Sequence, residues 1–194
     1  VADTSHTEGY LGLNVFGFGK PAQATFTAVR FRRTDSAEAR IRRVEALIDS
    51  AAQLQEQLRS DPHRPAYHFL PPQAWMNDIN GALFWKGRYH IFYQHNPEGG
   101  YWKWMQWGHA SSVDLVHWVH HPIALTPTPG GPDRDGCFSG GAVVHNGVPT
   151  VIYHGVPEGT CLATSQDDLL IRWTKHPANP VITPKKVAGD FRVY

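Results

Sequence analysis

The chain has 194 residues, of which 41% are apolar, so it can form a domain of ordinary size with a sizeable buried core. Its formal net charge is only +1 and 18% of its residues are charged, which gives no reason to expect a nucleic acid or a membrane surface as a partner. No apolar run approaches the roughly 20 residues of a membrane span, and no signal peptide is visible after Val1. We therefore expect a globular protein with a neutral ligand.

Residues 1–34 carry the pattern of two strands. Leu11, Leu13 and Val15 follow a period of two, and a second run with the same period follows a turn that contains Gly and Pro. Two strands alone are marginal in water, so we predict that this segment is the end of a β-sandwich whose other strands precede Val1. The alternative is a hairpin that adds to another sheet.

Residues 35–62 are predicted to form a helical linker. Apolar residues recur at steps of three and four positions up to Leu58, as one stripe of a helix requires. Asp35 and Glu38 provide a start that resembles a capping box, and we expect the helix to end before Pro62.

The third region, residues 63–194, begins where the composition changes, because all seven Trp residues lie at or beyond Trp75. It contains an internal repeat with an offset of 60 residues: GALFWKGRYHIFYQH begins at Gly81, and GAVVHNGVPTVIYHG begins at Gly141. Each copy has the pattern of a β-hairpin with a Gly turn. The predicted turns are Lys86-Gly87 and Asn146-Gly147.

Each hairpin is followed by a second matching element, with an acidic residue and a Leu ahead of a Trp that precedes Pro by four positions. The copies are SVDLVHWVHHP from Ser112, with Asp114-Leu115, and SQDDLLIRWTKHP from Ser165, with Asp168-Leu169. A repeating unit of about four short strands is typical of β-propeller blades. Two blades cannot close a propeller, so we expect the polypeptide to continue past Tyr194. The predicted fold class is all-β: a partial propeller with the first blades only, after a sandwich hairpin and a linker helix.

The repeat gives Asp78 a definite place in this fold. The first strand of each propeller blade lies nearest the central axis, so residues just before these strands face one funnel. We therefore expect Asn77 and Asp78 to converge with Phe138 and Ser139. A local alternative is turn chemistry, in which the Asn and Asp side chains bond their own backbone.

Aromatic and amide side chains are expected around the same funnel. Gln94 lies at the end of the second predicted strand, and the aromatic run of residues 101–107 contains Trp102, Trp104 and Trp107. A sugar ring offers an apolar face and a rim of hydroxyls, which aromatic faces and amides bind well. Carbohydrate is therefore the leading ligand class, and the alternative for Trp104 and Trp107 is packing between blades.

Other candidate centres have less support. Ser139 stands one place late for the Gly-x-Ser-x-Gly elbow of a serine hydrolase. Three neighbouring histidines lack a metal-ligand spacing, so we interpret them as surface imidazoles and predict no metal site. These are His117, His120 and His121. Cys137 and Cys161 are expected to be free.

Five motifs in chain order resemble glycoside hydrolase family 32, the β-fructofuranosidases. They are WMNDING from Trp75, FYQHNP from Phe92, WGHA from Trp107, SVDLVHW from Ser112 and FSG from Phe138. The resemblance covers residues 66–194 and implies a five-bladed β-propeller. It also implies that Asp78 is the nucleophile. The fructosyl subsite that it implies consists of Asn77, Asn80, Gln94, Trp102, Phe138 and Ser139.

The sequence departs from the family pattern at several places. Ile79 stands where the family usually has Pro, and Gly141 stands where a Ser is common. The family's acid/base Glu, in a Glu-Cys motif, and its stabilising Asp, in an Arg-Asp-Pro motif, are not present, although Phe191-Arg192 is similar to the approach to the latter. A retaining mechanism needs a second carboxyl about 5 Å from the nucleophile. We therefore predict that the chain as given is inactive.

The resemblance implies a retaining exo-acting enzyme that releases β-D-fructofuranosyl units from sucrose, levan or inulin through a covalent fructosyl-Asp intermediate, with no cofactor. A non-catalytic fructan-binding propeller and a fructosyltransferase remain open alternatives. The front end resembles the last strands of a concanavalin-like module, such as a fructan-binding module. An attached module of this kind favours a secreted or periplasmic location for the full-length protein.

Overall fold

The computed structural model describes residues 53, 56–65 and 67–183. The predicted sandwich hairpin and most of the linker helix lie outside these residues. The end of the linker is described: residues 56–58 are helical, and the hydrogen bond from Asp61 N to Leu58 O (3.1 Å) closes a turn before Pro62. Within the described part of the chain, no helix has the length and apolar character that a membrane crossing requires.

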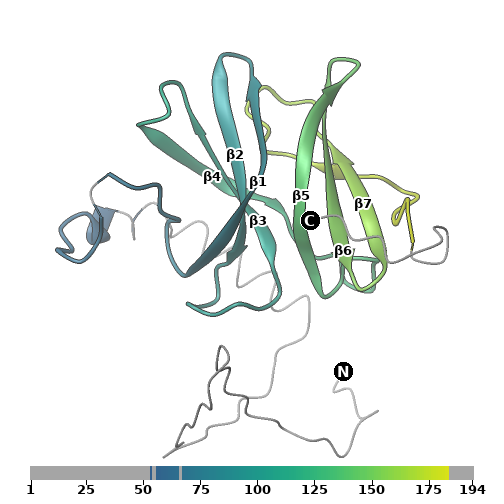
Figure 1. Cartoon of the computed structure of the whole chain (residues 1–194), viewed down its shortest axis with the longest axis horizontal. Coiled ribbons are helices and arrows are strands. Elements are labelled where there is room, and N and C mark those ends of the chain that lie inside the picture. The colour runs from purple at the N-terminus through teal and green to yellow at the C-terminus, as the bar shows by residue number, and fades with distance from the viewer. Residues whose placement is uncertain (1–52, 54–55, 66, 184–194) are drawn as a thin grey trace, which may run out of the picture. The chain divides into compact units, whose positions relative to one another are not determined.

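The described part of residues 63–194 is an all-β unit of two four-stranded antiparallel sheets, in which each strand pairs with the next (Figure 1). The first sheet contains β1 (Trp75–Trp85), β2 (Arg88–Asn96), β3 (Gln106–Ser112) and β4 (Trp118–Leu125). The second contains β5 (Gly136–His145), β6 (Val148–Val156), β7 (Gly159–Thr164) and β8 (Thr174–Lys175). The predicted repeat of four strands is confirmed, and each sheet has the meander order of one blade of a partial propeller.

The hairpin turns of both sheets are the predicted ones. Lys86 and Gly87 have φ angles of 47° and 80°, and Asn146 and Gly147 have 49° and 77°. Two successive residues with positive φ form a type I′ turn, whose twist matches that of the flanking strands. The local sequence therefore determines where each hairpin closes.

The connection to the last strand of each sheet is organised by an Asp side chain. Asp114 Oδ1 accepts a hydrogen bond from His117 N (2.8 Å), and Asp167 Oδ1 accepts one from Ile171 N (2.9 Å). The internal repeat predicted that Asp114 corresponds to Asp168, which is wrong by one residue, because Asp167 has the equivalent role. The second copy is two residues longer between Ser and Trp, and the structure absorbs this difference after the Asp.

The core lies between the two sheets. Phe92 and Trp107 of the first sheet and Tyr153 of the second are 0% exposed, and the ring centroids of Trp107 and Tyr153 are 6.1 Å apart. Full burial of a large apolar side chain stabilises the fold by about 1.5–3 kcal/mol. Cys137 and Cys161 belong to this core and are free, as predicted.

Strands β1 and β5 are adjacent in this packing (Figure 1). Gly81 of β1 lies at their contact. Gly81 has φ +51°, and a Cβ atom there would lie 3.1 Å from Ala142 Cβ and 3.2 Å from Phe92 Cδ2. The position therefore requires a glycine for two reasons, the left-handed backbone and the space.

Replacement of Gly81 by Ala is expected to lower the free energy of unfolding by about 2–5 kcal/mol, since backbone strain costs about 1–2 kcal/mol and overpacking about 1–3 kcal/mol. Gly87→Ala is the matched control, because Gly87 has φ +80° but no atom within 4 Å of an added Cβ. It should cost only the strain, about 1 kcal/mol. Denaturant unfolding measures both, and equal losses would show that the contact between β1 and β5 is not tight.

The interpretation of the histidine group as surface imidazoles is wrong for His120 and His121. His117 is exposed, but the other two are half-buried. Because side chains alternate along a strand, His121 faces the sheet interior opposite His109, and their ring centroids are 4.5 Å apart. His109 in turn lies 3.0 Å from His90, measured from Nε2 to Nδ1. Among the described residues, no group of His, Cys, Asp and Glu is arranged to hold a metal ion.

Candidate functional site

The predicted convergence of the two blades is present at Asp78. Ser139 Oγ donates a hydrogen bond to Asp78 Oδ2 at 2.6 Å, across 61 positions of sequence. Asp78 is exposed near the start of β1, and Ser139 lies near the start of β5. No residue in the described part of the chain donates to Oδ1. The carboxylate is therefore held by one oxygen while the second oxygen can meet a ligand.

Asn77 is also held in one orientation. Trp75 Nε1 donates to Asn77 Oδ1 at 2.8 Å. An indole N–H can only donate, so the bonded atom is the amide oxygen, and the NH₂ group remains available as a donor. Trp75 is fixed in turn by His95, whose Nδ1 lies 2.8 Å from Trp75 O. Trp75 was not among the predicted site residues, although its spacing of two from Asn77 puts both side chains on one face of the strand.

Asn80 and Gln94 lie beneath the surface and join the two sheets. Each is 2% exposed. Asn80 Oδ1 accepts a hydrogen bond from Gly140 N (3.3 Å), and Gln94 Nε2 donates to Cys137 O (2.9 Å). Asn80 Nδ2 is buried and has no partner within the described residues. The structure thus gives both amides a role in supporting β5, and their predicted contact with a sugar stays a prediction.

The three Trp residues of the aromatic run have different environments. Trp102 is 54% exposed, and its ring packs edge-on against Phe138 with centroids 5.4 Å apart. Trp104 and Trp107 are buried, and their indole N–H groups donate to Arg134 O and Phe138 O, both at 3.1 Å. Within this run, Trp102 is therefore the Trp that offers a ring face to a ligand.

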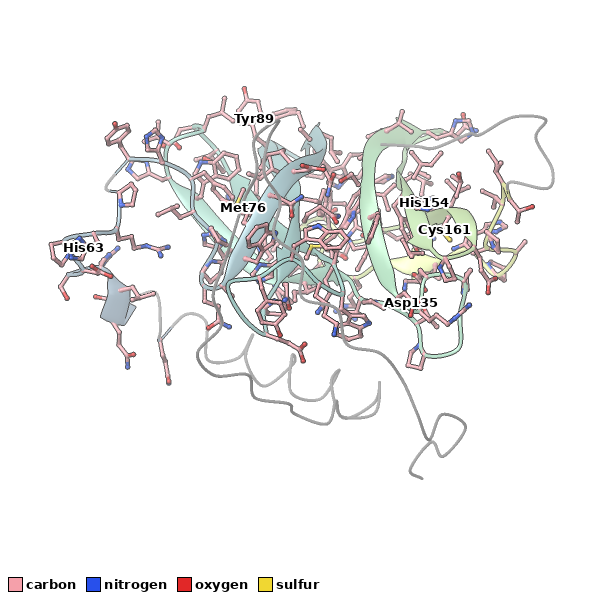
Figure 2. The ribbon with its side chains drawn as sticks, turned by 60° about the horizontal axis from the view of Figure 1, so that its bottom comes forward. His63, Met76, Tyr89, Asp135, His154 and Cys161 are labelled. Atoms are coloured by element: carbon pink, nitrogen blue, oxygen red, sulfur yellow. The ribbon has the colours of Figure 1, made fainter. Side chains whose placement is uncertain are left out.

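Phe138 continues the aromatic surface toward the second sheet. It is half-buried, and its ring centroid lies 6.2 Å from that of His154, which Figure 2 labels on the second sheet. Met76, labelled on β1 in the same figure, immediately precedes Asn77. The site thus lies where the two sheets adjoin, with polar groups on β1 and an aromatic surface beside them.

Several carboxylates near the site in sequence are occupied elsewhere. Asp133 forms an ion pair with Lys175, and Glu158 pairs with Arg134. Asp135 is exposed on the loop before β5 and is well separated from Met76 in Figure 2. None of them is hydrogen-bonded to Asp78 or Ser139 in the described part of the chain.

This arrangement suits one kind of chemistry. An exposed carboxylate with one restrained oxygen can act as a nucleophile, because the restraint orients the other oxygen for attack. An apolar aromatic face next to amide donors suits a neutral ligand with many hydroxyl groups. The geometry therefore favours covalent catalysis on a carbohydrate.

Comparison with known proteins also identifies relatives that are named as carbohydrate hydrolases. The model of the glycosyl hydrolases family 32 N-terminal domain matches residues 68–192. A sucrose-6-phosphate hydrolase of Escherichia coli is 45% identical over 162 residues, which are 77% of this chain and 33% of that protein. The Arabidopsis thaliana β-fructofuranosidase, insoluble isoenzyme CWINV1, is 40% identical over 139 residues, which are 67% of this chain and 24% of that protein.

Solved structures agree with the relatives. The crystal structure of fructan 1-exohydrolase IIa from Cichorium intybus superposes with a TM-score of 0.61 at 42% identity, over 64% of this chain and 25% of that chain. The present chain therefore spans about a third or less of the length of the proteins that it matches.

Proposed function

The chain belongs to glycoside hydrolase family 32, and from this membership we propose that it carries the nucleophile of a retaining glycosidase that releases terminal β-D-fructofuranosyl units. The observation that carries the proposal is the hydrogen bond from Ser139 to Asp78, together with the exposed ring of Trp102, which packs against Phe138, the residue before Ser139. Relatives named as a sucrose-6-phosphate hydrolase, a β-fructofuranosidase and a fructan exohydrolase support sucrose or a fructan as the substrate.

In the first step, Asp78 Oδ1 attacks the anomeric carbon of the fructosyl unit. The bond from that carbon to the leaving oxygen breaks, and the leaving oxygen takes a proton from a second carboxyl group. In the second step, the same group, now ionised, takes a proton from water, whose oxygen displaces Asp78 and releases fructose. Two displacements at one carbon retain its configuration.

Substrate binding is assigned to the groups around Asp78. The face of Trp102, supported by Phe138, covers the apolar side of the furanose ring, and the free NH₂ of Asn77 donates to a ring hydroxyl. Ser139 keeps Asp78 in one rotamer during the attack, which reduces the entropy lost on reaching the transition state.

We propose that the second carboxyl group belongs to a longer protein that contains these 194 residues and the remaining blades. We refer to this polypeptide below as the longer protein. Its existence is supported by the length of the relatives and by the engagement of the nearby carboxylates in other contacts.

The 194-residue chain is accordingly expected to release no measurable fructose from sucrose, inulin or levan, while the longer protein releases fructose with retained configuration. Product analysis by chromatography and NMR tests both. Turnover by the short chain contradicts the missing-acid proposal. Binding of fructan without turnover by the longer protein identifies a non-catalytic propeller, and a trisaccharide product from sucrose alone identifies a fructosyltransferase.

A further inference from the structure

A buried carboxylate lies on the loop that leads into β5, six residues before Ser139. Asp133 is 0% exposed. Its Oδ1 accepts a hydrogen bond from Thr128 N (3.0 Å). Its Oδ2 accepts three, from Tyr153 OH (2.8 Å), Lys175 Nζ (2.5 Å) and Cys137 Sγ (3.4 Å). One side chain thus joins the loop, β5, β6 and β8.

Lys175 completes this network from the last strand of the second sheet. Its ammonium also donates to Thr126 O and to Thr128 Oγ1 (2.8 Å), so it binds the start of the same loop. Burial by itself raises the pKa of Asp133, but the charge of Lys175 and the hydrogen bonds outweigh it and hold that pKa below its usual value. Asp133 is therefore ionised in the folded protein at neutral pH.

A buried ion pair of this kind contributes little net stability, because its desolvation cost offsets the attraction. The ion pair instead fixes the orientation of the Asp133 side chain and the position of the loop that carries it. Two oxygens with four donors leave Asp133 no second orientation, and the loop cannot shift without separating the charges. The stability of the fold therefore does not explain why a charged pair occupies this position.

The network reaches the catalytic carboxylate through a short, fully bonded segment of β5. Gly136 N donates to Asp133 O (3.0 Å), and Cys137 N donates to Met105 O (2.8 Å). The next carbonyls are held by the first sheet, Cys137 O by Gln94 and Phe138 O by Trp107. Ser139 follows directly and bonds Asp78. Asp133 thus fixes the N-terminal end of the segment that carries Ser139.

We propose that Asp133 is a positioning residue, which with Lys175 and Tyr153 holds residues 137–139 so that the Ser139 hydroxyl stays within hydrogen-bonding distance of Asp78. The expected effect on the reaction rate rests on the proposed function of Asp78. The expected effect on the distance between Ser139 and Asp78 does not depend on that function. Asp133 does not touch the substrate, because it is fully buried.

The kinetic test is a double-mutant cycle in the longer protein with sucrose as the substrate. Asp133→Asn is expected to lower kcat on the order of 10- to 100-fold, the cost of misplacing a reacting group by about 1 Å, with a smaller effect on KM. In a Ser139→Ala background the same change should lower kcat much less, since the contact that it positions is already absent. Equal losses in both backgrounds would mean a purely structural role and overturn the proposal.

Two further variants control the cycle. Asp167→Asn makes the same chemical change at another Asp of the second sheet, which caps the β7–β8 connection, and it should show no coupling to Ser139. Tyr153→Phe removes one hydroxyl from Asp133 and keeps the ring, so it tests the network if Asp133→Asn does not fold. It should lower kcat several-fold, again only when Ser139 is present.

Crystal structures of the wild type and of Asp133→Asn or Tyr153→Phe separate this inference from the proposed function. The distance from Ser139 Oγ to Asp78 Oδ2 is expected to increase from 2.6 Å to beyond about 3.5 Å, where a hydrogen bond is lost. An unchanged distance overturns the inference even if the enzyme is an active fructosidase. If the distance increases in the variant but the wild-type longer protein releases no fructose, the inference is supported and the proposed function is refuted instead.

Discussion

Replacement of Asp78 by Asn in the longer protein is expected to lower kcat/KM for fructose release by about 10⁴-fold or more. Loss of a covalent nucleophile removes the intermediate through which both steps proceed, and losses of this size follow when such a group is removed from an enzyme. Asn has nearly the same shape, and its amide oxygen can still accept the hydrogen bond from Ser139. The fold should therefore be preserved, and steady-state kinetics with sucrose measure the chemical effect alone.

A carboxylate far from the site provides the control. The side chain of Asp168 is 79% exposed, and its only ion pair among the described residues is with Lys86 at 3.9 Å. Exposed pairs of this kind are worth about 0–1 kcal/mol, so Asp168→Asn should leave kcat/KM unchanged. If Asp78→Asn keeps the activity of the wild type, as Asp168→Asn should, then the nucleophile has been assigned to the wrong residue.

The free energy of unfolding is expected to fall steeply as the pH drops from about 6.5 to about 4. Burial is the main cause that lowers the pKa of His90, His95 and His120 to about 4 each. An unfolded chain binds these protons near pH 6.5. The neutral imidazoles thus contribute their full stability above that pH, and the contribution is lost as the pH falls toward the folded pKa.

The size of this effect is large compared with the stability of a typical domain. One imidazole changes the free energy of unfolding by about 1.4 kcal/mol per pH unit within the window, so three change it by about 4 kcal/mol per unit. Domains are usually stable by only about 5–15 kcal/mol. We therefore expect acid unfolding between pH 6.5 and 4, measured by urea titrations at a series of pH values.

A single substitution tests the cause. His90 is 1% exposed, and its pKa is lowered first by burial and then by the charges of His121 and Arg88, while Asp167 of the other sheet acts in the opposite direction. His90→Phe should reduce the slope by about 1.4 kcal/mol per pH unit, because one buried base is removed. His145→Phe, on the exposed part of β5, is the matched control and should leave the slope as it is. An unchanged slope in His90→Phe would place the acid sensitivity elsewhere.

Much of this fold could be predicted from local sequence. The two hairpins close at Lys86-Gly87 and Asn146-Gly147 because type I′ turns require residues that accept positive φ. This requirement can be recognised from the two turn residues alone. The 60-residue offset predicted that Asp78 and Ser139 meet, since equivalent positions of successive blades lie at one funnel. The repeat thus determined both the strand order and the place of the site.

The environment of each side chain could not be predicted in the same way. Trp102 was placed in the subsite by the family resemblance, because the composition of residues 101–107 does not separate it from Trp104 and Trp107, and His120 and His121 resemble surface residues. Which rings are buried depends on packing between β3, β4 and the other sheet, which no local pattern records. The pairing of Asp114 with Asp168 in place of Asp167 has the same origin, because the two sequences do not show on which side of the Asp the longer loop takes up its extra residues.

The tertiary structure alone decided what holds the site in place. Lys175 and Asp133 are 42 positions apart, and Gln94 and Cys137 are 43 apart, so neither pair forms a recognisable spacing. Their contacts exist because buried polar groups must find partners, and the partners come from whichever strand folds beside them. The sequence by itself determined the blade repeat and the place of Asp78 at the funnel, since both depend on periodicity and turn chemistry, while the family motifs implied that Asp78 is the nucleophile. The support of that nucleophile depends on burial, which only the folded chain specifies.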